Sequence, residues 1–192
     1  MRKGRARILL MAICFMMSGC VRYQLVESND KVTVGAGFRV NPEIAWSMEQ
    51  NNTVYLWTVD GPSLEQLIFF PGVKDGAPLF TPANSSTAKE LPVYQTSMTL
   101  VEVADLLEAT LSRQGFHQME KRNLRPTPFG GQEGFRFDFT FVSKDGLEYR
   151  GMAAGTVKSD QLYLVMYMGT QLHYFDKYAP VAERILASIE VL

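Results

Sequence analysis

Residues 135–141 read Phe-Arg-Phe-Asp-Phe-Thr-Phe, a strict alternation of aromatic and polar side chains. Successive side chains of a β-strand point to opposite faces, so the phenylalanines share one face. Arg136, Asp138 and Thr140 then occupy the other face. The stretch therefore predicts a strand whose sheet buries an aromatic layer on one side.

The residues that follow this strand predict two hairpins. Lys144-Asp145-Gly146 is a turn before a strand at 147–157, and Lys158-Ser159-Asp160 is a turn before a strand at 161–169. The last strand contains Leu-Tyr-Leu-Val-Met-Tyr-Met, which is apolar at consecutive positions. Such a run is typical of a central strand that is covered on both faces. We therefore expect helices on both sides of one antiparallel sheet.

Two helices are predicted to supply this cover. Residues 99–114 place apolar side chains on one helical face, and Thr99 with Glu102 forms a capping-box pattern at the start. Residues 174–189 repeat the apolar spacing at the end of the chain. Proline is best tolerated in the first turn of a helix, so we expect the regular part of this helix to begin near Pro180.

The first half of the chain predicts shorter strands. We expect one strand at 31–40 with a bulge at its glycines, a second at 54–59, and a third at 64–70 that ends at Pro71. The long segment 71–98 is rich in proline and glycine and predicts irregular structure. Long loops inside compact domains are often functional, and a plain surface loop is the alternative.

This order of elements predicts an α+β fold, an antiparallel sheet flanked by helices in an α/β/α sandwich. It resembles the PsbP-like family, whose fold is shared with a Ran-binding nuclear-transport family. The resemblance covers residues 31–192 and rests on the hairpin run 135–169 and the terminal helix that ends in Ser188-Ile189-Glu190-Val191. It implies a non-enzymatic assembly or binding module, although a fold does not determine a function.

The N-terminus has the three parts of a bacterial signal peptide. Residues 1–7 are basic, and an uncharged apolar run of ten residues extends from Ile8 to Met17. This run is too short to span a bilayer as a helix and suits a signal peptide. The sequence Met17-Ser18-Gly19-Cys20 then resembles the lipobox of bacterial lipoproteins. An ordinary secretory signal with an incidental cysteine, or an uncleaved anchor, is the alternative.

The lipobox resemblance divides the chain into a signal peptide at 1–19, a lipidated polar tether at 20–30 and a single domain at 31–192. It implies that Cys20 carries the lipid that anchors the chain to the membrane. Val21 follows this cysteine where aspartate would favour inner-membrane retention, so the resemblance implies the outer membrane, facing the periplasm. A tether of this length would let the domain stand about 30–35 Å from the lipid surface.

Cysteine usage and charge exclude several functions. The chain has two cysteines, Cys14 and Cys20, so cleavage leaves no thiol for a disulfide, for thiol catalysis or for a cysteine metal site. Four of the 19 basic residues and none of the 20 acidic residues precede Cys20, which leaves a formal charge of −5 after cleavage. A mildly acidic domain lacks the electrostatic footprint of a nucleic-acid-binding protein.

Few residues are candidates for a site. Lys121, Arg122 and Arg125 form a basic cluster that could hold an acidic segment of a partner, or could be a solvated strand edge. The histidines are His117 and His173, and each is interpreted as structural or exposed.

Sequence motifs and aromatic residues add little to this list. Asp176 follows His173 by one helical turn and is a candidate cap and hydrogen-bond partner for it. The chain has no metalloprotease, serine-hydrolase or phosphate-loop motif, so we expect no metal, no cofactor and no enzyme activity. Trp46 and Trp57 are expected in the core, with a ligand cavity as the alternative.

The sequence therefore leaves three functions open. The first is a non-enzymatic, membrane-anchored module that binds an envelope protein or assists envelope assembly. The second is a small-molecule or lipid-binding lipoprotein with residues 71–98 as a lid over an aromatic cavity. The third is a hydrolase that uses His117 or His173.

Overall fold

The computed structural model describes residues 23–51, 54–80 and 91–192, which form two helices and eleven strands. The helices are α2 (Leu100–Arg113) and α3 (Tyr174–Ser188). The strands are β1 (Gln24–Val26), β2 (Val32–Val34), β3 (Phe38–Val40), β4 (Trp46–Asn51), β5 (Val54–Thr58), β6 (Glu65–Val73), β7 (His117–Pro126), β8 (Gly134–Val142), β9 (Glu148–Lys158), β10 (Gln161–Thr170) and β11 (Glu190–Val191).

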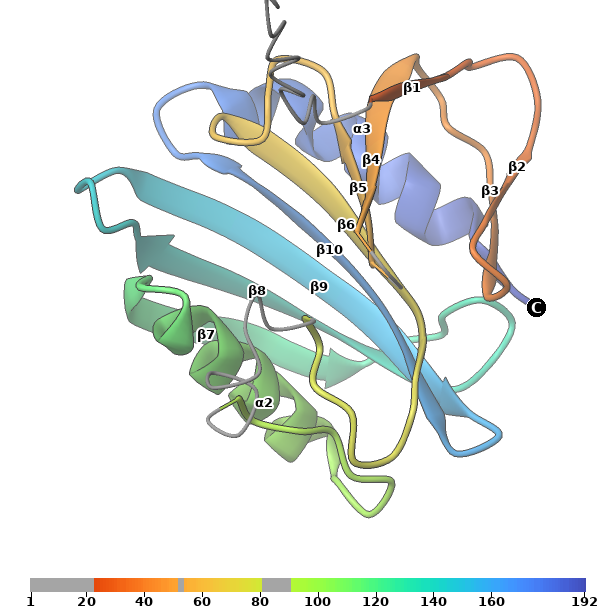
Figure 1. Ribbon diagram of the computed structural model, residues 1–192, viewed down its shortest axis with the longest axis vertical. Helices are drawn as coiled ribbons and strands as arrows, with labels where there is room; N and C mark the ends of the chain where they lie inside the picture. The colour runs from red at the N-terminus through yellow and green to blue at the C-terminus, as the bar shows by residue number, and fades with distance from the viewer. Residues whose placement is uncertain (1–22, 52–53, 81–90) are drawn as a thin grey trace, which may run out of the picture.

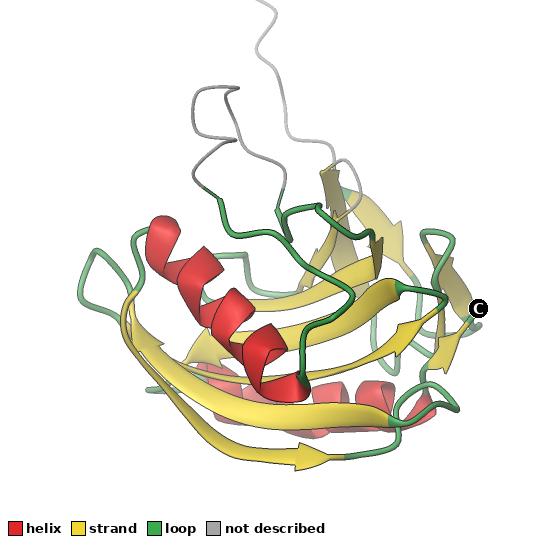
Figure 2. Ribbon diagram, turned by 90° about the horizontal axis from the view of Figure 1, so that it is seen from below, coloured by secondary structure: helices red, strands yellow, loops and turns green. Residues whose placement is uncertain are grey.

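Eight strands form one antiparallel sheet in the order β1-β4-β5-β6-β10-β9-β8-β7. Helix α2 covers one face of this sheet and helix α3 covers the other (Figures 1 and 2). The predicted α+β sandwich is confirmed. Neither described helix is long and apolar enough to cross a bilayer.

The two faces of the sheet carry separate cores because side chains alternate along each strand. The phenylalanines of β8 pack with α2, as their period predicts, together with Leu164 and Met166 of β10. Val165 and Tyr167 of β10 point the other way and pack with α3. Strand β10 is therefore central and buried on both faces, as its apolar run predicts.

The single strand expected at 31–40 is instead a hairpin of β2 and β3. Gly35 lies in the turn between them with a φ of 57°, a left-handed conformation that glycine adopts without steric cost. Strand β11 pairs with β3 and completes a small three-stranded sheet beside the main one.

Strand β6 does not end at Pro71 but continues to Val73. Its pairing with β10 shifts register there, because Pro71 pairs with Tyr163 and Val73 with Leu162. The extra residue is Gly72, which has a φ of 101°. A β-bulge tolerates proline because the backbone at that position needs no hydrogen-bond donor. Strand β6 therefore continues past Pro71.

Helix α3 begins at Tyr174 and contains Pro180, so the expectation of a start near Pro180 is wrong. Contacts from residues outside the helix stabilise its first turn. Tyr167 Oη donates hydrogen bonds to the carbonyl oxygens of Tyr174 and Phe175 at 2.9 and 3.1 Å. Phe175 is also buried in the core, and these contacts offset the backbone hydrogen bond that the proline removes.

Helix α2 follows its prediction. Thr99 is the N-cap, and the reciprocal capping box with Glu102 is present. The hydrogen bonds that Thr99 donates also lower the pKa of the Glu102 carboxyl. These contacts satisfy backbone donors at the start of α2 and fix the residue at which the helix begins.

Strand β1 lies inside the segment 20–30 that the sequence predicts as a polar tether. Gln24 pairs with Met48 and Val26 with Trp46, so the chain joins the sheet edge at β1. Residues 24–26 therefore belong to the sheet rather than to a free polar segment, because backbone pairing fixes them against β4.

Candidate functional site

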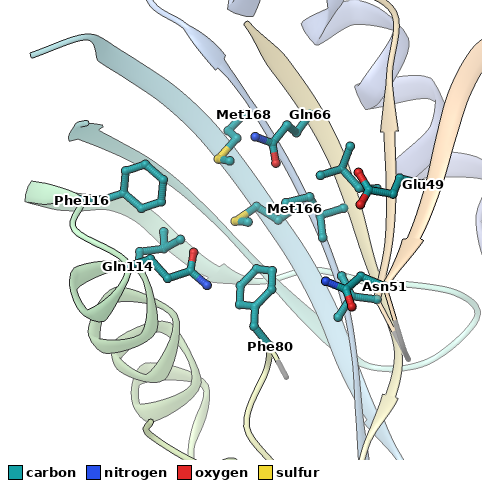
Figure 3. A pocket seen from close by; sticks show the side chains of 12 residues that line it. Glu49, Asn51, Gln66, Phe80, Gln114, Phe116, Met166 and Met168 are labelled. Atoms are coloured by element: carbon teal, nitrogen blue, oxygen red, sulfur yellow. The ribbon is translucent and has the colours of Figure 1, made fainter. Parts of the chain in front are cut away.

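The α2 face of the sheet contains a pocket of about 190 Å³, which we call the α2-face pocket. Its floor comes from β5, β6 and β10, and one wall is β4. The C-terminal end of α2, with Leu111 and Gln114, forms the opposite wall. The pocket therefore occupies the part of the sheet face between α2 and the β4 edge (Figure 3).

Cross-strand register explains which side chains line the floor. Glu49 of β4 pairs with Leu56 of β5, Leu56 pairs with Ile68 of β6, and Ile68 pairs with Met166 of β10. Directly paired residues point to the same face, so these four side chains form one row across four strands. In the next row, Gln66 pairs with Met168.

Two aromatic side chains from outside the sheet complete the pocket. Phe80 packs on Phe70 with its ring centre 5.1 Å away, and Phe116 packs on Phe141 at 4.7 Å. In Figure 3, Gln114 and Phe116 lie on one side of the pocket and Glu49 lies on the other. The rings and the sheet together enclose a mainly apolar space.

Polar groups lie at the rim of this space. They are the amides of Asn51, Gln66 and Gln114 and the carboxylate of Glu49, which is the one charged group among the 12 described lining residues. Gln66 Nε2 donates a hydrogen bond to the carbonyl oxygen of Pro62. An apolar floor with a few polar groups at its edge is the usual composition of a ligand pocket.

Tyr23 connects the pocket to the N-terminal end of the described chain. Its hydroxyl is hydrogen bonded to Glu49, and burial together with that carboxylate raises the pKa of Tyr23. Tyr23 directly precedes β1 and follows Cys20 by three positions. The rim of the pocket therefore lies beside the N-terminal end of the described chain.

A second hollow of about 310 Å³ adjoins the pocket past the end of α2. The two share Gln66, Gln114, Phe116 and Met168 in their linings. The adjoining hollow extends to the β8–β9 turn at residues 143–147. Together they form a continuous depression on this face of the sheet.

The predicted lipobox, Met17, Ser18, Gly19 and Cys20, lies outside the described residues, so the anchor stays a prediction. The predicted lid at 71–98 is described for 71–80 and 91–98 only. Phe80 from this segment lines the pocket, and Tyr94 is fully buried, so the described parts belong to the core as well as to the surface.

The structure separates the predicted basic cluster. Lys121 pairs with Phe139 in register and faces α2, where it forms ion pairs with Asp105 and Glu108. Arg122 pairs with Asp138 and faces the other side of the sheet, with an ion pair to Glu120. Arg125 donates to the carbonyl oxygen of Asn123. Lys121 therefore faces away from Arg122 and Arg125, whose register partners Asp138 and Arg136 share the other face of the sheet.

The two histidines also lie apart. His117 begins β7 and His173 follows β10, and strands β8 and β9 separate those two strands in the sheet. Asp176 does not pair with His173 as expected, because Arg150 donates a 2.9 Å hydrogen bond to it. His173 is the N-cap of α3 but makes no capping hydrogen bond, and it stacks edge-on against Tyr174.

Trp46 and Trp57 lie in the α3-face core, as expected, with ring centres 6.1 Å apart. The aromatic lining of the pocket comes instead from Phe80 and Phe116, which the sequence did not single out. In the described ranges no three histidine, aspartate or glutamate side chains converge as metal ligands would.

Comparison with known proteins identifies the fold. No protein-family profile matches the sequence, and no curated protein matches it. The solution structure of cyanobacterial PsbP (CyanoP) from Synechocystis sp. PCC 6803 is similar, with a TM-score of 0.54 and 15% identity over 92% of this chain and 96% of that one. This likeness shows a PsbP-like fold.

Two further solved structures overlap more weakly. LpqN of Mycobacterium tuberculosis, described as involved in cell envelope biogenesis, has a TM-score of 0.39 and 8% identity over 88% of this chain and 90% of that one. The Saccharomyces cerevisiae Ran-binding protein Mog1p has a TM-score of 0.45 and 12% identity over 90% of this chain and 96% of that one. The likeness to CyanoP alone carries the assignment of the PsbP-like fold, which the strand pattern resembles.

Proposed function

We propose that this chain is a non-enzymatic binding module of the bacterial cell envelope, anchored through Cys20, that holds an apolar ligand in the α2-face pocket. The observation that carries this proposal is the composition of the pocket. An apolar floor of Leu56, Ile68, Met166 and Met168 is bordered by three amides and a single carboxylate. Such a site removes apolar surface from water and orients the ligand at its rim.

The absence of a catalytic pair in the described lining supports a binding role. Acid–base or nucleophilic catalysis requires a nucleophile or acid within hydrogen-bond reach of a base. Glu49 is the one acidic group among the described lining residues, and its partner is the hydroxyl of Tyr23. The proposed module therefore binds its ligand unchanged.

The proposed location follows from the N-terminal sequence. A lipid on Cys20 would anchor the chain, and Val21 at the next position favours the outer membrane with the domain in the periplasm. Tyr23 follows Cys20 by three positions, a span of at most about 10 Å. The domain would then lie close to the lipid surface, with the pocket rim near the anchor.

Ligand binding can be tested with an uncharged fluorophore that brightens in apolar surroundings, such as Nile red. We expect the full chain to bind it, and Gln114→Trp to weaken binding about tenfold because the indole would occupy the exposed mouth of the pocket. Arg113→Trp is the matched control, because Arg113 is exposed on the same helical turn and does not line the pocket. Equal binding by both variants would contradict the proposal.

A protein partner is the second candidate, and a different surface favours it. Leu100, at the start of α2, and Val157 of β9 are 37% and 40% exposed, and both line a shallow hollow with Pro126 and Pro128. Val101, the next residue of α2 after Leu100, is 57% exposed. Exposed apolar groups in such a cluster are typical of protein interfaces.

This second surface can be tested by crosslinking in intact envelopes. We expect the wild-type chain to recover one stoichiometric partner, and Val101→Glu with Val157→Glu to lose it. Gln114→Trp, at the other end of α2, should retain the partner. Recovery of no stoichiometric partner would remove this candidate and leave the pocket proposal standing.

A further inference from the structure

We propose that the ligand of the α2-face pocket is a single fatty-acyl chain whose headgroup is not an anion. This inference rests on the proposed function, since it names the class of ligand that the pocket takes. It uses three independent features of the described residues: the shape and lining of the floor, the charges of the rim, and the position of the rim relative to the anchor.

The floor suits a flexible, unbranched hydrocarbon. Met166 and Met168 supply unbranched side chains that adapt to an irregular occupant, and Ile68 and Leu56 extend the apolar surface along the same rows. The pocket and the adjoining hollow share Met168 and Phe116, so the depression continues past the end of α2, where Ser143, Lys144 and Asp145 make its lining more polar. A flexible chain can follow such a continuous depression.

The volume sets how much of a chain enters. The α2-face pocket measures about 190 Å³, and a water molecule occupies about 30 Å³ in the liquid, so there is room for roughly six groups of that size. A methylene group is similar in size to a water molecule. The pocket itself therefore holds a segment of an acyl chain, and the rest lies in the adjoining hollow or outside.

The rim discriminates between headgroups. Glu49 is the one charged group in the described lining, and no lysine, arginine or histidine accompanies it there. A carboxylate or phosphate seated at this rim would meet a like charge and no counter-charge. The amides of Asn51, Gln66 and Gln114 can instead hydrogen-bond to an ester or amide linkage. The rim therefore favours an acyl ester or amide over a free fatty acid.

The position of the rim brings acyl chains within reach. Tyr23 is hydrogen bonded to Glu49 at the rim, and Cys20 lies three residues before it, at most about 10 Å away. Acyl chains on Cys20, and those of the surrounding bilayer, would therefore be present at high effective concentration. Both sources offer the same chemistry, a hydrocarbon chain on an uncharged linkage.

The first test uses monoacylglycerols of increasing chain length, which compete with Nile red for the full chain carrying Cys20→Ser. Each buried methylene contributes about 0.8 kcal/mol, so we expect affinity to rise about fourfold per methylene until roughly six are buried, and more slowly afterwards. Free fatty acids of equal length should bind more weakly. Gln114→Trp should abolish the length dependence and Arg113→Trp should preserve it.

The outcomes separate this inference from the proposed function. If Nile red binds but no acyl compound displaces it, the pocket binds apolar ligands and the acyl inference is wrong. If a peptide or a rigid aromatic compound copurifies in the pocket and acyl chains do not compete, the inference is likewise overturned. If Nile red itself does not bind, the proposed function fails first.

The second test identifies the source of the chain. Cells are fed a photoreactive fatty acid, and crosslinks to the peptide that contains Gln114 and Phe116 are mapped in wild-type protein and in a Cys20→Ser protein that a fused N-terminal transmembrane helix holds at the membrane. Crosslinks in wild type alone indicate the chain's own anchor, and crosslinks in both indicate a bilayer lipid. Either result supports an acyl ligand, and the absence of crosslinks to this peptide in both proteins overturns it.

Discussion

Arg136 of β8 and Glu183 of α3 form a two-pronged ion pair across the α3 face of the sheet. Arg136 Nη1 donates to Glu183 Oε2 at 2.5 Å, and Nη2 donates to Oε1. The hydrogen bonds to Glu183 raise the pKa of Arg136, against the opposing effect of burial. The Arg136 side chain is 17% exposed, and its buried Nε has no partner among the described residues.

Glu183→Gln should destabilise the fold by about 1–3 kcal/mol, because it removes the nearer of two counter-charges from a guanidinium that is mostly shielded from water and leaves only Asp138 at 3.7 Å. Urea unfolding monitored by tryptophan fluorescence measures the change. The matched control is Glu120→Gln, which breaks an ion pair to Arg122 whose side chains are 65% and 62% exposed. We expect the control to change stability by less than about 1 kcal/mol. Equal losses of stability in both variants would contradict the expectation that the shielded ion pair contributes more than the exposed one.

This pair shows what the strand pattern could and could not predict. The alternation at 135–141 correctly places Arg136 on the face opposite the phenylalanines, because side-chain period depends on local backbone geometry alone. The partner Glu183 comes from a distant helix, and only tertiary packing brings the two together. The same limit explains the basic cluster, because Lys121 and Arg122 are neighbours in sequence but lie on opposite faces of β7.

Glu65→Gln should stabilise the protein increasingly as pH rises. Burial raises the pKa of Glu65, and this outweighs the hydrogen bonds that it accepts from Thr58 and from the backbone of Val59 and Asp60. A raised folded-state pKa contributes stability below the unfolded-state value and loses it as pH rises through the folded-state value. Unfolding free energies at about pH 4 and about pH 8 measure the effect.

Glutamine retains the oxygen that accepts from Thr58 Oγ1 at 2.6 Å and from Val59 N at 2.5 Å, so the hairpin should stay intact. The control is Glu133→Gln at an exposed carboxyl, which should leave the pH profile of stability unchanged. A Glu65→Gln profile parallel to wild type would show that burial does not control this carboxyl.

Asp60→Asn should act with the opposite sign of pH dependence. Hydrogen bonds from Lys177 and Tyr178, at 2.6 and 2.7 Å, lower the pKa of Asp60. A lowered folded-state pKa contributes stability above the unfolded-state value, and this stability is lost as pH falls through the folded-state value. The variant should therefore be less stable than wild type at neutral pH and equal to it in acid.

The exposed Asp145 in the β8–β9 turn supplies the control for this experiment. Asp145→Asn should be neutral at both pH values. If Asp60→Asn showed a constant loss at every pH, the contribution of Asp60 would come from hydrogen-bond geometry rather than from its charge.

The pocket lay beyond sequence prediction for a related reason. Its floor and one wall combine residues of four strands, and their common row depends on register across β4, β5, β6 and β10. Strand β4 lacks a clear alternation and was not predicted, so Glu49 and Asn51 could not be assigned to any face. Gln66 is the one pocket residue that the sequence pattern could have pointed to, because it is polar in the otherwise apolar run of β6 on the α2 face.

Gly151→Val should destabilise the α2 side of the sheet by about 1–3 kcal/mol or more through overpacking. Gly151 pairs with Phe139 in register, and a Cβ at Gly151 would overlap the Phe139 ring. Thermal unfolding measures the loss. Phe139→Leu combined with Gly151→Val should recover part of it, because the smaller side chain leaves room, and a strictly additive double variant would contradict direct contact.

Cys20→Ala should abolish both fatty-acid labelling and membrane association. Thioether attachment of the lipid requires the thiol, and multiple acyl chains hold a protein on a membrane because each buried methylene contributes about 0.8 kcal/mol. Metabolic labelling with a radioactive fatty acid, followed by separation of membrane and soluble fractions, measures both effects. Cys14→Ala supplies a matched control, since this cysteine lies in the segment predicted to be removed and its loss should change neither result.

The domain should fold alike with and without the lipid, because the described sheet begins at β1 and its cores contain no residue before Val26. Purified Cys20→Ala should therefore keep the wild-type unfolding midpoint while it leaves the membrane fraction. Persistent labelling of Cys20→Ala would overturn the anchor. Loss of both labelling and folded protein would instead show that the N-terminal segment stabilises the sheet edge, where Tyr23 contacts Glu49.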